Sequence, residues 1–159
     1  MATILPVAQL GEEILALVAA PVTESEFASE WLEILSQSMQ ATMLLRNGVG
    51  IAAPQIYVSK RLIIVASRPN LRYPDAPNMD AIVMINPEIT KRSIQMVLGE
   101  EGCLSVPDER GQVARADQIS VQYFTLAGEK IYQDFSGFPA RIVQHEIDHL
   151  DGILFVERI

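Results

Sequence analysis

The chain has 159 residues, of which 49% are hydrophobic and 20% are charged, and its formal net charge is −8. This composition predicts one globular domain over residues 1–159, and the acidic balance argues against a nucleic-acid-binding surface. The first positive residue is Arg46 and no apolar run is as long as a membrane span, so we expect a cytoplasmic protein without targeting signal or membrane association.

The first clear element is a long helix near the N-terminus, predicted over residues 24–46. Thr23 and Glu26 form the pattern of a capping box, and Asn47-Gly48 supplies a C-terminal stop. Apolar side chains recur inside it at helical spacing, and we interpret this stripe as core packing without chemistry. The stripe consists of Phe27, Trp31, Ile34, Leu35, Met39 and Met43.

Short strands separated by turns follow this helix. A bend of small residues at 48–55 leads into extended chain, and residues 67–80 contain three prolines and two asparagines, which predicts a surface loop. The expected strands are residues 61–66, 81–85, 94–98, 119–126 and 130–135, the last two forming a hairpin. A glycine-containing bend is expected at 99–105, after the third of them. A final helix is predicted from Ser136 or Gly137 to about Asp151. Strands grouped between two helices favour the α+β class.

The final helix contains the sequence His145-Glu146-Ile147-Asp148-His149, an H-E-x-x-H pattern that holds both histidines of the chain. Imidazoles four positions apart lie one turn apart on the same helix face, so both can bind one divalent metal ion. Glu146 can then accept a proton from a water molecule at that ion. The pattern favours a metal-dependent hydrolase, and two histidines that merely satisfy hydrogen bonds are the alternative.

Two histidines leave a catalytic metal site one protein ligand short. Zinc proteases with this pattern take the third ligand from further along the chain, where Asp151 and Glu157 lie on a short tail. Cys103, the only cysteine, lies in the bend at 99–105, and its thiol would lose its proton on binding a metal. Cys103 is therefore the favoured third ligand, with a small buried apolar residue as the alternative reading.

Three segments together point to a known family. Residues 48–55, 101–105 and 144–149 resemble, in order and spacing, the three signature motifs of peptide deformylase. The resemblance implies an α+β fold with mixed or antiparallel sheets around a central helix that carries H-E-x-x-H. It also implies removal of formate from the N-terminal formyl-methionine of newly made polypeptides.

The resemblance also implies roles for single residues. Cys103, His145 and His149 resemble the metal ligands, and Glu146 resembles the general base that later returns the proton to the leaving amine. The Gln55 side-chain amide and the Leu104 backbone N–H resemble the donors to the developing oxyanion. A surface glutamine is the alternative reading of Gln55. The ligand set suits several ions, and the family commonly uses ferrous iron, so we expect Fe(II), with Zn, Ni or Co as substitutes.

A peptide site is expected around these residues. The backbone of Gly50 and of Gly102 can hold a formyl-methionyl peptide as an added strand, and a plain tight turn is the alternative for each glycine. Residues on the His145 face of the helix, with one from across the cleft, are expected to line the methionine pocket, although their spacing also fits ordinary packing. They are Phe138, Ile142, Val49 and, through its aliphatic stem, Arg141.

Three further expectations concern Glu101, the overall function and the ribosome. Glu101 and Arg110 are expected to form an ion pair that shapes the loop around Cys103, unless they form an ordinary surface pair.

A zinc-type metallopeptidase and a catalytically silent metal- or peptide-binding relative stay open as alternative functions. Many bacterial deformylases continue into a C-terminal helix that docks on the ribosome, whereas this sequence stops at Ile159, so ribosome docking is not expected.

Overall fold

The structure is a computed structural model, and it describes residues 3–159. The strands are β1 (Gly50–Ala52), β2 (Leu62–Ser67), β3 (Met79–Arg92), β4 (Met96–Cys103), β5 (Val106–Ala116), β6 (Gln118–Phe124) and β7 (Lys130–Ser136). The α-helices are α1 (Glu30–Leu45) and α2 (Gly137–Leu150), and 3₁₀ turns occur at Glu13–Ala16, Glu24–Glu26, Ala53–Ile56 and Phe155–Arg158. None of the described helices is long and apolar enough to cross a bilayer.

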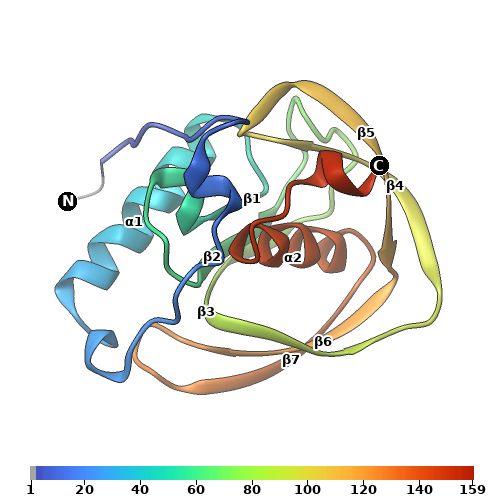
Figure 1. The fold of residues 1–159 in the computed structure, drawn as a ribbon. Helices are drawn as coiled ribbons and strands as arrows, with labels where there is room; N and C mark the ends of the chain where they lie inside the picture. The colour runs from blue at the N-terminus through green and yellow to red at the C-terminus, as the bar shows by residue number, and fades with distance from the viewer. Residues whose placement is uncertain (1–2) are drawn as a thin grey trace.

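The strands form two antiparallel sheets, so the fold is α+β. Five strands pair in the order β1-β2-β3-β6-β7, and β4 pairs with β5 in a separate two-stranded sheet. In the view of Figure 1, α2 lies between α1 and the β4–β5 hairpin, and the C-terminus ends beside that hairpin. Helix α2 therefore contacts both sheets, the larger one through β1 and β2 and the smaller one through β5.

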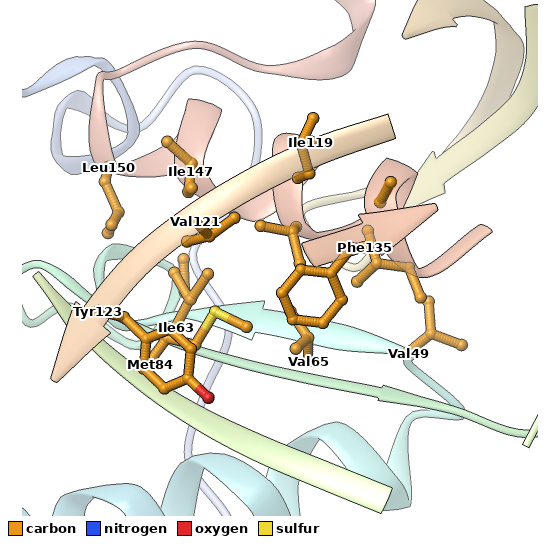
Figure 2. Close-up of a cluster of buried hydrophobic side chains, with 14 of the residues drawn as sticks. Val49, Ile63, Val65, Met84, Ile119, Val121, Tyr123, Phe135, Ile147 and Leu150 are labelled. Carbon is orange, nitrogen blue, oxygen red and sulfur yellow. The ribbon is translucent and has the colours of Figure 1, made fainter. Parts of the chain in front are cut away.

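Strand β2 is buried on both faces because the two helices pack on opposite sides of it. Successive side chains of a strand point to opposite faces. Leu62 and Ile64 belong to the cluster that contains Met39 of α1. Ile63 and Val65 belong to the cluster that contains Leu150 of α2, and Figure 2 shows this second cluster with strand and helix side chains facing one another. This packing fixes the position of the helix that carries the histidines.

The N-terminal helix is shorter than the sequence predicted. Thr23 and Glu26 do form a capping box, in which Glu26 Oε1 accepts from Thr23 N at 2.8 Å. This box caps the start of a short 3₁₀ turn and not of the α-helix. Ala28 then takes a left-handed conformation (φ 57°) that interrupts the helix, and Ser29 caps α1 by accepting from Leu32 N.

The apolar stripe of this helix is only partly buried. Met39 and Met43 are fully buried, whereas Trp31 is 45% exposed and Ile34 is 38% exposed. Because α1 begins at Glu30, Trp31 lies in its first turn, at the edge of the packed region. The interpretation of Trp31 and Ile34 as core residues was wrong.

The predicted strands agree with the structure to different degrees, and the strand predicted over residues 81–85 lies within the longer β3. Strand β2 and the β6–β7 hairpin lie close to their predicted bounds. The predicted bend at 99–105 was wrong, because β4 continues through it to Cys103. Strand β5 was not predicted, and it pairs with β4 along nearly its whole length. Segment 68–78, between β2 and β3, contains no regular element, as expected of a loop.

Candidate active site

Two elements bring three metal-binding side chains together. Cys103 is the last residue of β4, and His145 and His149 lie one turn apart on α2. Their ligand atoms all lie within 4.8 Å of one another, and Cys103 Sγ is 3.3 Å from His149 Nε2. All three residues are buried. Two imidazoles and one thiol at this spacing fit a single divalent metal ion.

The surroundings of Cys103 favour its thiolate form. Burial raises the pKa of the Cys103 thiol, but the charge of His149 and hydrogen bonds from both imidazoles outweigh it and hold that pKa well below its usual value. The backbone N–H of Ser105 also points to Cys103 Sγ at 3.4 Å. A thiolate is the form that binds a metal, so the donor set is chemically suited to a cation.

His145 is oriented by Glu101, a buried carboxylate two residues before Cys103 in β4. His145 Nδ1 lies 3.0 Å from Glu101 Oε1, so Nδ1 faces the carboxylate and the opposite ring nitrogen, Nε2, is the one that can serve as a ligand. Arg115 donates two hydrogen bonds of 2.9 Å to Glu101, and Arg141 donates a third of 2.7 Å. Burial raises the pKa of Glu101, but hydrogen bonds from Arg115 and His145 outweigh it and hold that pKa well below its usual range.

The expected pair between Glu101 and Arg110 is not formed. Glu101 lies opposite Gly111 in the hairpin, and Gly102 lies opposite Arg110. Because strand side chains alternate between faces, Arg110 shares a face with Glu100 rather than with Glu101. Arg110 accordingly pairs with Glu100 at 3.4 Å at the surface.

Glu146, the candidate base, is a buried carboxylate with a free oxygen. It is 4% exposed, and among the described residues Glu146 Oε1 has no hydrogen-bond partner. Burial raises the pKa of Glu146 to about 6, against a lowering by the charges of His145 and His149. A Cβ added to Gly50 would overlap Glu146 Oε2 and lie 2.9 Å from its Cδ, so glycine is needed here for close approach.

Gln55 is buried rather than on the surface, which excludes the alternative reading of this residue. Gln55 Oε1 accepts from Ala52 N at 2.9 Å, and Gln55 Nε2 donates to Ser105 Oγ at 3.1 Å. These two contacts fix which end of the amide faces Cys103, whose Sγ lies 3.5 Å from Gln55 Nε2. The amide carries two hydrogens, so one is directed to Ser105 and the other to Cys103 Sγ, where the long contact leaves it within reach of a ligand in the cavity.

One cavity connects the predicted residues. It is lined by the candidate catalytic residues Gln55, Leu104 and Glu146, by the ligands Cys103 and His145, and by the predicted peptide-contacting residues Val49, Gly50, Gly102, Phe138, Arg141 and Ile142. His149 is 1% exposed and lies behind the cavity, against Cys103. Every residue assigned to the site from the sequence is therefore in or next to this cavity.

Arg141 lines the cavity, as expected, and its charged group makes further contacts. Its guanidinium donates to Glu101 and, at 2.8 and 2.7 Å, to the carbonyl oxygens of Val113 and Val97. The charged group is thus fully engaged in joining α2 to the β4–β5 hairpin.

Two residues of the cavity wall were missed by the sequence reasoning. Arg72 and Tyr73, from segment 68–78, also line it. The sequence marked this segment as a surface loop by its prolines and asparagines, which indicate a turn but not what the turn covers.

The alternative third ligand on the C-terminal tail is engaged elsewhere. Asp151 Oδ1 accepts from Arg61 Nη2 at 3.0 Å, and Glu157 is exposed. The arrangement that remains is a buried thiolate with two imidazoles, a carboxylate with a free oxygen and an oriented amide. These groups suit metal-assisted hydrolysis of an amide.

Comparisons with known proteins give a consistent match. Residues 4–159 match the family described as polypeptide deformylase. Peptide deformylase 2 of Shewanella oneidensis is 49% identical over 154 residues, which are 97% of this chain and 83% of that protein. The crystal structure of a class I type b peptide deformylase from Acinetobacter baumannii with Met-Ala-Ser bound is 68% identical, with a TM-score of 0.98 and full coverage of both chains. A probable peptide deformylase from Synechococcus phage S-SSM7 is 37% identical, with a TM-score of 0.86 over 98% of this chain and 99% of that chain.

Proposed function

The chain belongs to the polypeptide deformylase family, and on this premise we propose how its residues perform the metal-dependent release of formate from the N-terminal formyl-methionine of new polypeptides. The observation that carries the proposal is the buried cluster of Cys103, His145 and His149 beside the free oxygen of Glu146. A divalent cation held by the three ligands supplies a Lewis acid, which acidifies water and polarises a carbonyl group.

Glu146 moves the proton in the proposed reaction. Its carboxylate accepts a proton from the attacking water and returns it to the departing amine nitrogen, and the acid proton of the product also passes to the amine, so that water and the formamide become formate and a protonated amine. The raised pKa of Glu146, about 6, suits both steps, because a group of this pKa accepts and gives up a proton near neutral pH.

Gln55 and Leu104 stabilise the negative charge that develops on the formyl oxygen. Gln55 Nε2 has one hydrogen on Ser105, and the second, which makes a long contact of 3.5 Å to Cys103 Sγ, would turn to this oxygen. The Leu104 backbone N–H follows Cys103 directly and is the proposed second donor. Fixed donors aimed at a developing charge lower the barrier without reorganising during the reaction.

The peptide lies in the cavity in extended form. Its backbone pairs with the edges that Gly50 and Gly102 offer on β1 and β4, and its methionine side chain packs among Val49, Phe138 and Ile142. The bound Met-Ala-Ser in the Acinetobacter baumannii enzyme supports a peptide of this kind as ligand.

We propose Fe(II) as the resident ion, with Zn, Ni or Co as substitutes, because a thiolate and two imidazoles suit each of them. Metal analysis after purification without oxygen is expected to find about one iron per chain. Zinc at that stoichiometry under the same conditions would contradict the assignment.

Replacing the base tests the proposed function. Glu146→Ala is expected to keep its metal content while formate release from formyl-Met-Ala-Ser falls by about 10²- to 10⁴-fold, the usual contribution of a general base. Glu157→Ala, which removes an exposed carboxylate, is the matched control.

Substrate controls separate the competing functions. Acetyl-Met-Ala-Ser is expected to remain intact, and so are internal peptide bonds of longer substrates. Cleavage of internal bonds would favour a metallopeptidase, and absence of formate from the metal-loaded wild type would favour a silent binding relative. Wild-type activity of Glu146→Ala would contradict the assigned base.

A further inference from the structure

The backbone of Gly102 is occupied by a side chain of its own protein. Gly102 N–H donates to Tyr73 Oη at 3.0 Å, and the Tyr73 hydroxyl donates to the Gly102 carbonyl oxygen at 3.4 Å. One phenol thus contacts both hydrogen-bonding groups of a single strand residue.

These groups belong to the edge of β4 that faces the cavity. Among the described strands, β4 pairs only with β5. Both backbone groups of one residue in an antiparallel strand point to the same side. Since the Gly102 N–H reaches Tyr73, both point away from β5, toward the side on which an added peptide strand would pair. Tyr73 therefore holds the position that the proposed substrate backbone needs.

Segment 68–78 presents Tyr73 in this position through a few contacts. Asn70 Oδ1 accepts from Arg72 N and Tyr73 N at 2.8 and 2.9 Å, so hydrogen bonds within the segment stabilise the turn that precedes Tyr73. The Tyr73 ring packs on Phe138, with ring centroids 5.2 Å apart, and lies 4.8 Å under the Arg110 guanidinium. These ring contacts do not depend on the hydroxyl, so the hydroxyl can be removed without removing the packing.

We propose that Tyr73 is a specificity-determining residue that competes with the substrate backbone for the Gly102 edge. This inference rests on the proposed function. A peptide long enough to pair with Gly102 must displace the Tyr73 hydroxyl. Part of the free energy gained from its hydrogen bonds to Gly102 is therefore offset by the loss of the hydrogen bonds between Tyr73 and Gly102. A formyl-methionine derivative too short to reach Gly102 binds with the hydroxyl in place. Lengthening the peptide therefore increases its affinity for the wild-type enzyme less than it would if the Gly102 backbone groups had no internal partner.

The test removes the hydroxyl and varies the length of the ligand. Tyr73→Phe is expected to lower KM for formyl-Met-Ala-Ser by roughly two- to tenfold, the scale of one net hydrogen bond, with kcat little changed. KM for formyl-Met-amide is expected to stay at the wild-type value. Tyr123→Phe is the matched control, because the Tyr123 hydroxyl also donates one hydrogen bond, to Gln133, but lies outside the cavity.

A binding measurement keeps the inference separate from the proposed function. Calorimetry with the unformylated product Met-Ala-Ser on zinc-loaded protein is expected to show tighter binding by Tyr73→Phe in the same proportion. If wild type releases no formate, the proposed function fails, and this binding measurement still decides the role of Tyr73. An unchanged or weaker affinity for Met-Ala-Ser in Tyr73→Phe overturns the inference. An equal gain for formyl-Met-amide also overturns it, because the hydroxyl would then act on the methionine pocket rather than on the β4 edge.

Discussion

At the scale of single residues, Gly50 makes room for Glu146. Gly50→Ala is expected to push the Glu146 carboxylate from its place, because the added methyl group would overlap it and the carboxylate is buried. Misplacement of a catalytic group by about 1 Å can cost on the order of a hundredfold in rate, and we expect a loss of that size in kcat with metal content unchanged. Steady-state formate release and metal analysis measure the two quantities.

Gly48→Ala is the matched control for this substitution. Its added methyl group would lie 3.1 Å from Leu104 Cδ1 and 3.3 Å from Met43 Cγ, both on side chains that can shift slightly. We expect this variant to keep most of its activity. Similar losses in the two variants would contradict a specific effect of Gly50 on Glu146.

The residues of the candidate site that lie in short sequence motifs could be predicted one by one. The residues that form ion pairs with the site could not. Cys103, His145 and His149 lie in short motifs made of residue types that commonly bind metal ions. The partner of Glu101 depends on strand parity, since Arg115 lies on its face of the hairpin and Arg110 on the other. That parity requires β5, which the sequence did not reveal.

At the scale of elements, buried charges join the β4–β5 hairpin to α2. Asp148 of α2 accepts from Arg115 of β5 at 2.6 Å and from Arg158 of the last 3₁₀ turn at 2.6 and 2.9 Å. Burial raises the pKa of Asp148, but hydrogen bonds from Arg158 and Arg115 outweigh it and lower that pKa below 3.8. A carboxyl with a depressed pKa stabilises the folded state above its unfolded pKa, and this stabilisation is lost as pH falls through the folded value.

We therefore expect Asp148→Asn to be destabilising at neutral pH and less so in acid. Its free energy of unfolding at pH 7 should be about 3 kcal/mol lower than that of wild type, because a buried charge pair loses one partner. The difference should shrink as pH falls from the ordinary pKa of an aspartate through the lowered pKa of Asp148, where the carboxyl of the folded wild type becomes protonated. Urea unfolding of the metal-free proteins from pH 7 to pH 2.5 measures it.

Asp151→Asn is the control for the buried pair. Asp151 pairs with Arg61, and its side chain is 46% exposed. A surface pair of this kind contributes about 0–1 kcal/mol, so little change is expected. A difference between Asp148→Asn and wild type that stays constant over the whole pH range would contradict a role for the Asp148 charge.

Strand β5 shows why part of the fold could not be predicted at the element scale. Its sequence contains Pro107, Gly111 and several charged residues, and most of its first half is exposed. It lacks the Ile- and Val-rich pattern that identified β2, whose side chains are buried on both faces. Pairing with β4, the preceding strand of the same hairpin, holds it in place, and this pairing does not require residues of high β-propensity.

At the scale of the whole molecule, the proposed metal ligands come from two different packing units. Cys103 ends the two-stranded sheet and packs with Val106, Val113 and Phe155. The histidines lie on α2, whose core cluster includes residues of the five-stranded sheet. A bound ion therefore links the hairpin to the rest of the fold, in addition to the ion pairs of Glu101 and Asp148.

Metal removal is expected to lower stability and to loosen the hairpin first. An ion present at about 1,000 times its Kd stabilises the folded state by about 4 kcal/mol, which corresponds to roughly 10 °C in Tm for a chain of this length. Calorimetry with and without chelator measures the shift. Amide hydrogen exchange should become faster in β4 and β5 than in α1.

Cys103→Ser is the control for metal removal. It lacks the thiolate ligand, so chelator is expected to change its Tm by only a small fraction of the wild-type shift. An equal acceleration of exchange in α1 and in the β4–β5 hairpin would contradict the proposed link.

The contact between Tyr73 and Gly102 also bears on solubility. An exposed strand edge with unsatisfied backbone groups is a template for association with other chains, and proteins commonly cover such edges. The Tyr73 phenol satisfies both Gly102 groups at the cavity side of β4. At Gly102 the resting protein thus presents no free backbone groups to a neighbouring copy, while a flexible peptide can still reach the same groups by displacing the phenol.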